Sequence, residues 1–289
     1  MMDRGVIKKI LEFQKSEITE HYIYDRLADS VKNPKNKAVL KKISADEKRH
    51  YHFWKQYTKR DVEPDRFKVS KYIFLSKIFG ITFGIKLMEN GEEGAQEAYT
   101  KISKFVPAAK NIIKDEDEHE RKLISLLDEE RLKYVGSMVL GLNDALVELT
   151  GALAGFTLAL KNTPLIAMVG AVTGIAAALS MAASEYLSTK TEEQSKSPLK
   201  AAIYTGTAYI FAVVLLIIPY LIFSNVYAAL SVAVINAIII IFLFTFYISV
   251  AKDIPFKKRF LEMAGISLGV AAVSFCIGFV IRILFGVEV

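Results

Sequence analysis

Apolar and polar residues follow two different patterns along this chain, and the change falls near residue 135. Before it, apolar positions recur at helical spacing with charged residues between them. After it come five apolar runs, each long enough to span a bilayer: 135–160, 164–189, 199–223, 226–250 and 262–286. The pattern predicts an all-α protein, with a helical domain at residues 1–134 and a five-helix transmembrane domain at residues 135–289.

Proline and turn residues divide the first part into helices. We expect the four helices of a bundle at 5–31, about 34–59, 91–104 and 107 to about 131. The stretch 67–88 is apolar but carries lysines at intervals, so it is too interrupted for a comfortable span. Its pattern favours a basic amphipathic helix that lies on the membrane surface or packs against another subunit.

Charge separates the same two parts. Residues 1–134 hold 28 of the 37 Lys and Arg residues, 23 of the 31 Asp and Glu residues, and all four histidines. The net charge of +6 is spread over both parts, and the basic residues of the second part lie in short loops, so we expect no nucleic-acid partner. Residues 1–9 lack the apolar core of a cleavable signal peptide. The only cysteine, Cys276, lies in an apolar run, which predicts a small buried residue rather than a disulfide or thiolate site.

The basic residues between the apolar runs predict the orientation in the membrane. The loop after the second run holds Lys190, Lys196 and Lys200, and the loop after the fourth holds Lys252 and the basic residues of 257–259. Since basic loops stay in the cytoplasm, the N-terminal domain is expected there as well. Five spans then place the C-terminus outside the cell or in an organelle lumen.

A metal-binding type of motif occurs twice in the first part. Asp-Glu-x-x-His stands at residues 46–50 and again at 115–119, on the expected second and fourth helices. Glu-x-x-His places a carboxylate and an imidazole one turn apart on the same helix face. The other two helices also correspond, because Glu17 and Glu92 are each followed by a tyrosine seven residues later. The domain therefore reads as a duplicated helical hairpin.

One Glu from each of two helices and Glu-x-x-His from each of the other two form the ligand set of di-iron and di-manganese bundles. Carboxylate and imidazole together suit iron and manganese. Over roughly residues 5–131 the sequence resembles the rubrerythrin branch of the ferritin-like family. The resemblance implies a di-iron site, with manganese as the other candidate metal, whose ligands are Glu17, Glu47, His50, Glu92, Glu116 and His119.

Several neighbouring residues leave alternatives open. Further candidate metal contacts on the same helices are Glu20, Glu89, Glu93 and Glu97. The alternative to a metal site is a solvated acidic face, which two matching copies of the motif make the weaker interpretation. We interpret His21 and His52 as surface or packing residues, with His52 also a candidate hydrogen-bond donor to the site. Trp54 is expected in the core rather than in contact with a cofactor.

Carboxylates also occur inside the first two apolar runs. Asp144 and Glu148 lie one turn apart in the first run, and Met181 and Glu185 lie one turn apart in the second. Charged groups within a bilayer are costly, so they indicate an ion or proton path. Two simpler interpretations stay open: Glu185 lies near the end of its run and can be an interfacial carboxylate, and Met181 can serve packing alone.

The same two runs resemble the vacuolar iron transporter family, through Gly141-Leu142-Asn143-Asp144 and the segment 178–186, ALSMAASEY. The resemblance covers the five-span plan of about residues 135–289. It implies proton-coupled export of Fe²⁺, and of Mn²⁺, from the cytosol by a homodimer. It also assigns Asp144 and Met181 to the transport path and Glu185 to its cytoplasmic mouth.

One feature departs from that family, which commonly has an acidic helical insert between the second and third spans. Here the loop at 188–198 is short and offers only Glu192 and Glu193, so Glu193 is a further candidate metal contact. We expect the N-terminal domain to collect or sense the ion instead.

Transport is therefore the leading hypothesis, and enzymatic activity is left open. The alternative is a membrane-tethered di-iron ferroxidase or peroxidase. The chain lacks the cysteine ligands of a rubredoxin iron, which argues against reductive turnover but not against oxidation of Fe²⁺. An anchor needs one or two spans, not five with buried acids, so the pattern favours transport. A purely structural membrane protein would not require two metal-type sets of residues.

Overall fold

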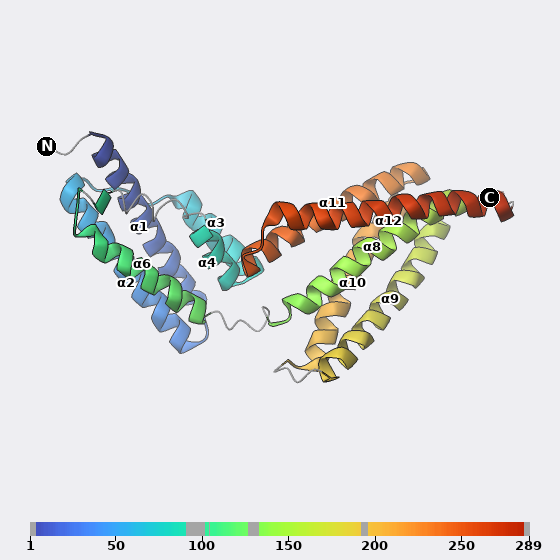
Figure 1. The fold of residues 1–289 in the computed structure, drawn as a ribbon, viewed down its shortest axis with the longest axis horizontal. Helices are drawn as coiled ribbons and strands as arrows, with labels where there is room; N and C mark the ends of the chain where they lie inside the picture. Colours follow the sequence, from blue (N-terminus) through green and yellow to red (C-terminus); the bar gives the residue numbers. More distant parts are fainter. Residues whose placement is uncertain (1–3, 91–101, 104, 127–132, 192–195, 286–289) are drawn as a thin grey trace. The chain divides into compact units, whose positions relative to one another are not determined.

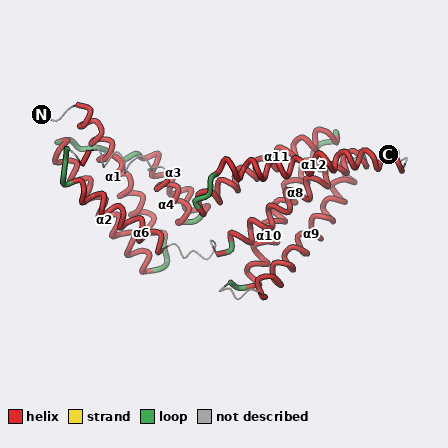
Figure 2. Tube along the Cα trace, viewed as in Figure 1, coloured by secondary structure: helices red, strands yellow, loops and turns green. Residues whose placement is uncertain are grey.

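The computed structural model describes residues 4–90, 102–103, 105–126, 133–191 and 196–285. These residues form ten helices and contain no strand, so the predicted all-α class is confirmed (Figures 1 and 2). The chain divides into two compact units, Met1–Glu129 and Glu130–Val289, and each has apolar clusters of its own.

The first unit is built on the pair α1 (Arg4–Ser30) and α2 (Pro34–Thr58), with α6 (Ala109–Leu126) packed against α2 (Figure 1). Asn33 begins α2, because its side chain accepts hydrogen bonds from the backbone N–H groups of Lys35 and Asn36. Pro34 fits the first turn, where its missing N–H leaves no partner unsatisfied. The expected third bundle helix at 91–104 lies almost entirely outside the described residues.

The stretch 67–88 forms two helices instead of the expected one. α3 (Arg66–Phe79) ends at Gly80, whose φ of 99° favours glycine, and α4 (Ile81–Asn90) follows directly. Val69 of α3 and Ile85 of α4 are buried in an apolar cluster with residues of α1 and α2. The expectation of a single helix was therefore wrong, because Gly80 separates α3 from α4. The inner faces of both helices complete the apolar core of the first unit.

Five long apolar helices make up the second unit: α8 (Val135–Leu160), α9 (Thr163–Thr191), α10 (Pro198–Ile222), α11 (Val226–Lys252) and α12 (Phe256–Phe285). Each is long and apolar enough to cross a membrane, as expected. α8 packs against each of the other four, so it is the central helix of the unit.

Glycines allow neighbouring helices to approach α8 closely. A Cβ atom on Gly141 would lie 2.4 Å from the backbone oxygen of Thr205 on α10. A Cβ atom on Gly278 of α12 would lie 2.2 Å from the backbone oxygen of Gly155. Both distances are too short for any side chain, so these contacts require glycine.

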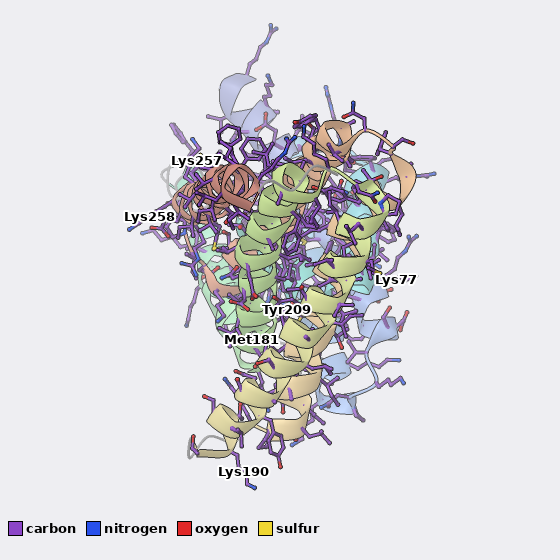
Figure 3. The ribbon with its side chains drawn as sticks, turned by 90° about the vertical axis from the view of Figure 1, so that its right-hand side faces the viewer. Lys77, Met181, Lys190, Tyr209, Lys257 and Lys258 are labelled. Atoms are coloured by element: carbon purple, nitrogen blue, oxygen red, sulfur yellow. The ribbon has the colours of Figure 1, made fainter. Side chains whose placement is uncertain are left out.

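The last helix differs from expectation in two ways. α12 begins at Phe256, directly after Pro255, so Lys257 and Lys258 lie in its first turn and not in a loop (Figure 3). The helix thus begins six residues before the apolar run that was expected from residue 262. Cys276 is exposed, which contradicts the prediction of a buried residue. In a spanning helix an outward-facing apolar side chain meets lipid, so an apolar run does not imply burial within the protein.

Candidate metal centre and membrane path

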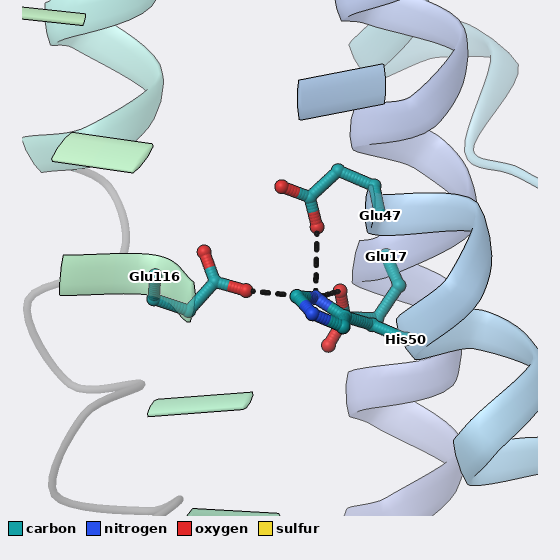
Figure 4. A group of neighbouring side chains, drawn as sticks. All are labelled: Glu17, Glu47, His50 and Glu116. Carbon is teal, nitrogen blue, oxygen red and sulfur yellow. Dashed lines mark ion pairs between the residues drawn. The ribbon is translucent and has the colours of Figure 1, made fainter. Parts of the chain in front are cut away.

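Three helices of the first unit bring three glutamates and a histidine into one cluster (Figure 4). Glu17 comes from α1, Glu47 and His50 from α2, and Glu116 from α6. One ligand atom from each of these four residues lies within 4.8 Å of the others. His119, one turn after Glu116 on α6, is also buried and faces the same cluster.

The two imidazoles and two of the carboxylates alternate around the centre. The Nδ1 atom of His50 lies 3.1 Å from Glu116 Oε1 and 3.5 Å from Glu47 Oε2. The Nδ1 atom of His119 lies 3.1 Å from Glu47 Oε1 and 3.7 Å from Glu116 Oε2. Each of Glu47 and Glu116 therefore faces both histidines, while Glu17 Oε2 lies 3.4 Å from His50 Nδ1. Two carboxylates shared between two nitrogen ligands can bridge a pair of cations.

The residues present fit a metal ion. Four buried atoms of the cluster form no hydrogen bond within the described part of the chain: Glu47 Oε2, His50 Nδ1, Glu116 Oε1 and His119 Nδ1. Buried polar atoms without hydrogen-bond partners are rare and costly, and each histidine here lies within ion-pair distance of both glutamates. Oxygen and imidazole nitrogen donors together are the ligands that iron and manganese accept.

Each imidazole is oriented by an aspartate from the other copy of the motif. His50 Nε2 lies 3.2 Å from Asp115 Oδ2, and His119 Nε2 lies 3.1 Å from Asp46 Oδ2. In the neutral imidazole that a metal requires, a proton held on Nε2 by an aspartate leaves the lone pair of Nδ1 directed at the centre. Arg49 joins the two aspartates, at 2.5 Å from Asp46 and 2.7 Å from Asp115.

Sequence reasoning did not assign these supporting residues. The aspartate before each Glu-x-x-His was visible as part of the repeated motif, but only the fold shows that each one serves the opposite repeat. Trp54 is fully buried, as expected, but its Nε1–H also donates a hydrogen bond to Glu17 Oε1 at 3.0 Å. The prediction of Trp54 as a core residue is confirmed, and the bond to Glu17 is a further contact that was not predicted.

Burial and crowded charge shift the pKa values in the cluster. Burial, together with the neighbouring Glu116 carboxylate, raises the pKa of Glu47 well above its usual range. Burial disfavours the charged imidazolium of His119, but the carboxylates of Glu116 and Glu47 outweigh it and raise the pKa to about 10. The pKa of His50 is raised for the same reason. In the metal-free protein, protons on the imidazoles therefore offset the buried carboxylates.

The other candidate residues of the first unit have varied positions. Glu20 is buried on α1. His21 is partly buried and hydrogen-bonded to Ser44 through Nδ1, and His52 is exposed on α2. The remaining predicted positions lie outside the residues or side chains that the structure describes: Glu89, Glu92, Glu93 and Glu97.

In the second unit, α8 places two carboxylates beside a tyrosine of α10. The hydroxyl of Tyr209 donates a hydrogen bond to Glu148 Oε2 at 3.1 Å. Asp144 lies one turn earlier on α8, within electrostatic reach of both Glu148 and Tyr209. Tyr209 was not predicted, because the same run contains other hydroxyl residues, among them Tyr204, Thr205 and Tyr220, and the sequence does not distinguish Tyr209 from them.

A second polar group joins the ends of α8 and α9. The hydroxyl of Ser137 donates a hydrogen bond to Glu185 Oε1 at 2.6 Å, and Thr205 donates to the backbone oxygen of Ser137 at 3.0 Å. Met181 is partly buried against the apolar core of the unit. In Figure 3, Met181 and Tyr209 appear at similar heights, well above Lys190 near the end of α9. Glu193 lies outside the described residues.

Comparisons with known proteins agree with both halves of this description. A sequence model of the VIT family matches residues 135–197 and 190–279. A model named Rubrerythrin matches residues 10–131, so the two resemblances seen in the sequence are confirmed in their predicted order. No curated protein and no solved structure matches the chain.

Proposed function

This chain belongs to the VIT family, and from that premise we propose that it exports Fe²⁺ and Mn²⁺ from the cytosol in exchange for protons, as a homodimer. Membership of the family indicates metal transport through the membrane, and the five apolar helices supply the spans. The observation that carries the proposal is a buried Glu and His cluster, able to hold a metal, in the same chain as these spans.

We place the cytosolic mouth of the path at Glu185. The bond from Ser137 holds this carboxylate where α8 begins and α9 ends. A carboxylate at that level attracts a hydrated divalent cation and replaces part of its water. This role also accounts for the simpler interpretation of Glu185 as an interfacial residue.

The inner part of the path lies at Asp144 and Glu148. Two carboxylates one turn apart can bind a divalent cation together, and either can take up a proton when the cation leaves. The hydroxyl of Tyr209 holds one oxygen of Glu148 and so turns this carboxylate toward α10. Met181 contributes a thioether, which favours a transition metal over Mg²⁺ or Ca²⁺.

The first unit collects or senses the metal. Glu17, Glu47, His50, Glu116 and His119 would hold one or two ions, and a bound iron pair supplies one-electron chemistry. The chain's own residues orient the ligands: Asp46 and Asp115 hold the imidazoles, and Trp54 holds Glu17.

Transport by purified protein in liposomes tests this proposal. We expect Asp144→Asn, which removes both a charge and a proton carrier, to lower Fe²⁺ flux driven by a pH gradient by roughly tenfold or more. The matched control is Glu262→Gln, which removes an exposed carboxylate on α12 that pairs with Arg259. Unchanged Fe²⁺ flux in Asp144→Asn would show that the path runs elsewhere.

A second candidate function, oxidation of Fe²⁺ by the first unit, is favoured by the two carboxylates that each face both imidazoles. Stopped-flow absorbance on the full chain with Fe²⁺ and oxygen separates the two activities. An oxidase that is independent of transport keeps its rate in Asp144→Asn and loses it in Glu47→Gln.

A further inference from the structure

The outer face of α3 carries large apolar side chains among lysines. Phe67, Phe74 and Ile78 are 78%, 62% and 49% exposed, and their spacing places them on one face of the helix. Lys71 lies on the same face, and Lys77 lies beside it. Both lysines are exposed. Exposed aromatic residues grouped in this way mark an interaction surface more often than an ordinary solvent face.

The folding of the first unit does not explain this face. α3 packs into the unit through its opposite side, where Val69 and Ser76 are buried and Tyr72 and Ile73 contact the apolar cluster. The inner face is therefore complete without Phe67, Phe74 and Ile78.

The charge of this face suits an anionic surface. Lys71 and Lys77 form no ion pair with any residue that the structure describes. Apolar side chains that enter the headgroup region, flanked by lysines that reach the phosphates, are the usual composition of a helix lying on a membrane. Anionic lipids attract such lysines, and the attraction falls off within a Debye length.

The chain itself keeps a bilayer within reach. Residues 127–134 are the whole connection between the end of α6 and the start of α8. Because consecutive spans alternate in direction, the start of α8 is expected on the same side of the membrane as the turns between α9 and α10 and between α11 and α12. In the sequence, those turns and the adjoining helix ends carry a net positive charge, since their basic residues outnumber Glu192, Glu193 and Asp253. They would repel the lysines of α3, so lipid fits this face better than the loops do.

We propose that the outer face of α3 docks onto the anionic surface of the membrane that holds the second unit. The docking depends only on the five spans and the composition of α3, and it holds whichever metal is carried and in whichever direction. It keeps α3 at the lipid surface of that membrane.

A fluorescent label on α3 tests the docking in the full chain. The label is placed by Ser70→Cys, an exposed position between Phe67 and Phe74, in a Cys276→Ala background that leaves one reactive thiol. The matched control carries the label at Gln56→Cys, which is exposed on α2. Each protein is placed in nanodiscs with a nitroxide-labelled lipid as quencher, either of phosphatidylcholine alone or with about a third phosphatidylglycerol, enough to make the surface anionic.

We expect strong quenching at position 70 and little at position 56, and only in the anionic discs. The double variant Lys71→Glu/Lys77→Glu should reduce the ratio of docked to undocked protein by roughly fivefold or more for each lysine removed. The double variant Phe67→Ser/Phe74→Ser should reduce it as well, and both substitute exposed residues that the core does not need. Equal quenching at the two positions, or quenching that ignores lipid charge, would overturn the proposal. Energy transfer between labels of two copies without lipid quenching would also overturn it, by assigning the face to self-association.

Discussion

At the scale of single residues, the metal centre depends on groups that never reach the metal position. Asp46 and Asp115 contact the outer nitrogens of His119 and His50, and Arg49 connects the two aspartates. This arrangement fixes both ring orientations with one arginine. A change at any of the three should therefore disturb two ligands that lie on different helices.

Asp115→Ala should weaken metal binding by roughly 10–100-fold, because His50 loses the acceptor that orients its ring. Asp115→Asn keeps an acceptor oxygen and should recover part of the loss. Trp54 is the only tryptophan of the chain and bonds to Glu17, so its fluorescence follows Mn²⁺ titrations of the full protein. The control is Asp61→Ala, an exposed aspartate that pairs with Lys55. Equal affinity of Asp115→Ala and the native protein would contradict the role of Asp115.

At the scale of helices, α8 determines how closely the membrane unit can pack. It contacts all four other spans and brings Asp144 and Glu148 beside α10. The contact at Gly141 lets the backbone of α10 approach at the level where Thr205 also bonds to Ser137. Close packing and the position of the polar groups are therefore linked.

Gly141→Ala should destabilise the second unit by about 1–3 kcal/mol, because the new Cβ must displace the Thr205 backbone. Gly265→Ala is the matched control, since nothing lies within 4 Å of its Cβ position and alanine favours a helix. The temperature at which detergent-solubilised protein loses its monodisperse chromatographic peak reports the difference. A midpoint for Gly141→Ala equal to that for Gly265→Ala would show that the helices move apart without cost.

Much of this architecture can be predicted from spacing alone. The five spans and the helices that carry the two copies of Asp-Glu-x-x-His are predictable, because helix formation depends on the local spacing of apolar and polar residues. The break at Gly80 was missed because the apolar pattern continues across it. The early start of α12 was missed because a helix can begin several residues before its apolar run. Tyr209 and the crossed aspartates could not be assigned, because those contacts depend on how separate helices meet.

At the scale of the whole molecule, stability should respond to metal and to pH through the first unit. The stabilising contribution of the His119 imidazolium is complete below the unfolded pKa, near 6.5, and is lost as the pH rises through about 10. A metal ion requires neutral imidazoles, so its binding releases protons and strengthens as the pH rises. The metal-free unit should therefore weaken with rising pH while the metal-bound unit is protected.

Thermal unfolding followed by Trp54 fluorescence measures this in the full chain, with chelator or with Mn²⁺. At a metal concentration about 100 times the dissociation constant, the stabilisation of about 2.7 kcal/mol should raise the midpoint by roughly 10 °C. His119→Asn should abolish the rise, and Glu12→Gln, an exposed glutamate paired with Lys9, should keep it. Equal unfolding midpoints with chelator and with Mn²⁺ would show that the Glu and His cluster does not bind this metal.

The crossed pairing of aspartates and histidines also has a consequence for the symmetry of the metal centre. Asp46 serves His119 and Asp115 serves His50, so the two repeats are related by exchange around the centre. Neither repeat completes the arrangement alone. Two copies of a helix that carries Asp-Glu-x-x-His, related by a twofold axis, would reproduce both Asp–His pairs. Arg49 departs from that symmetry, because the matching position in the second copy is Glu118 and one arginine contacts both aspartates. The pairing is therefore pseudosymmetric, and the two copies of the motif have to be present together for either imidazole to be held.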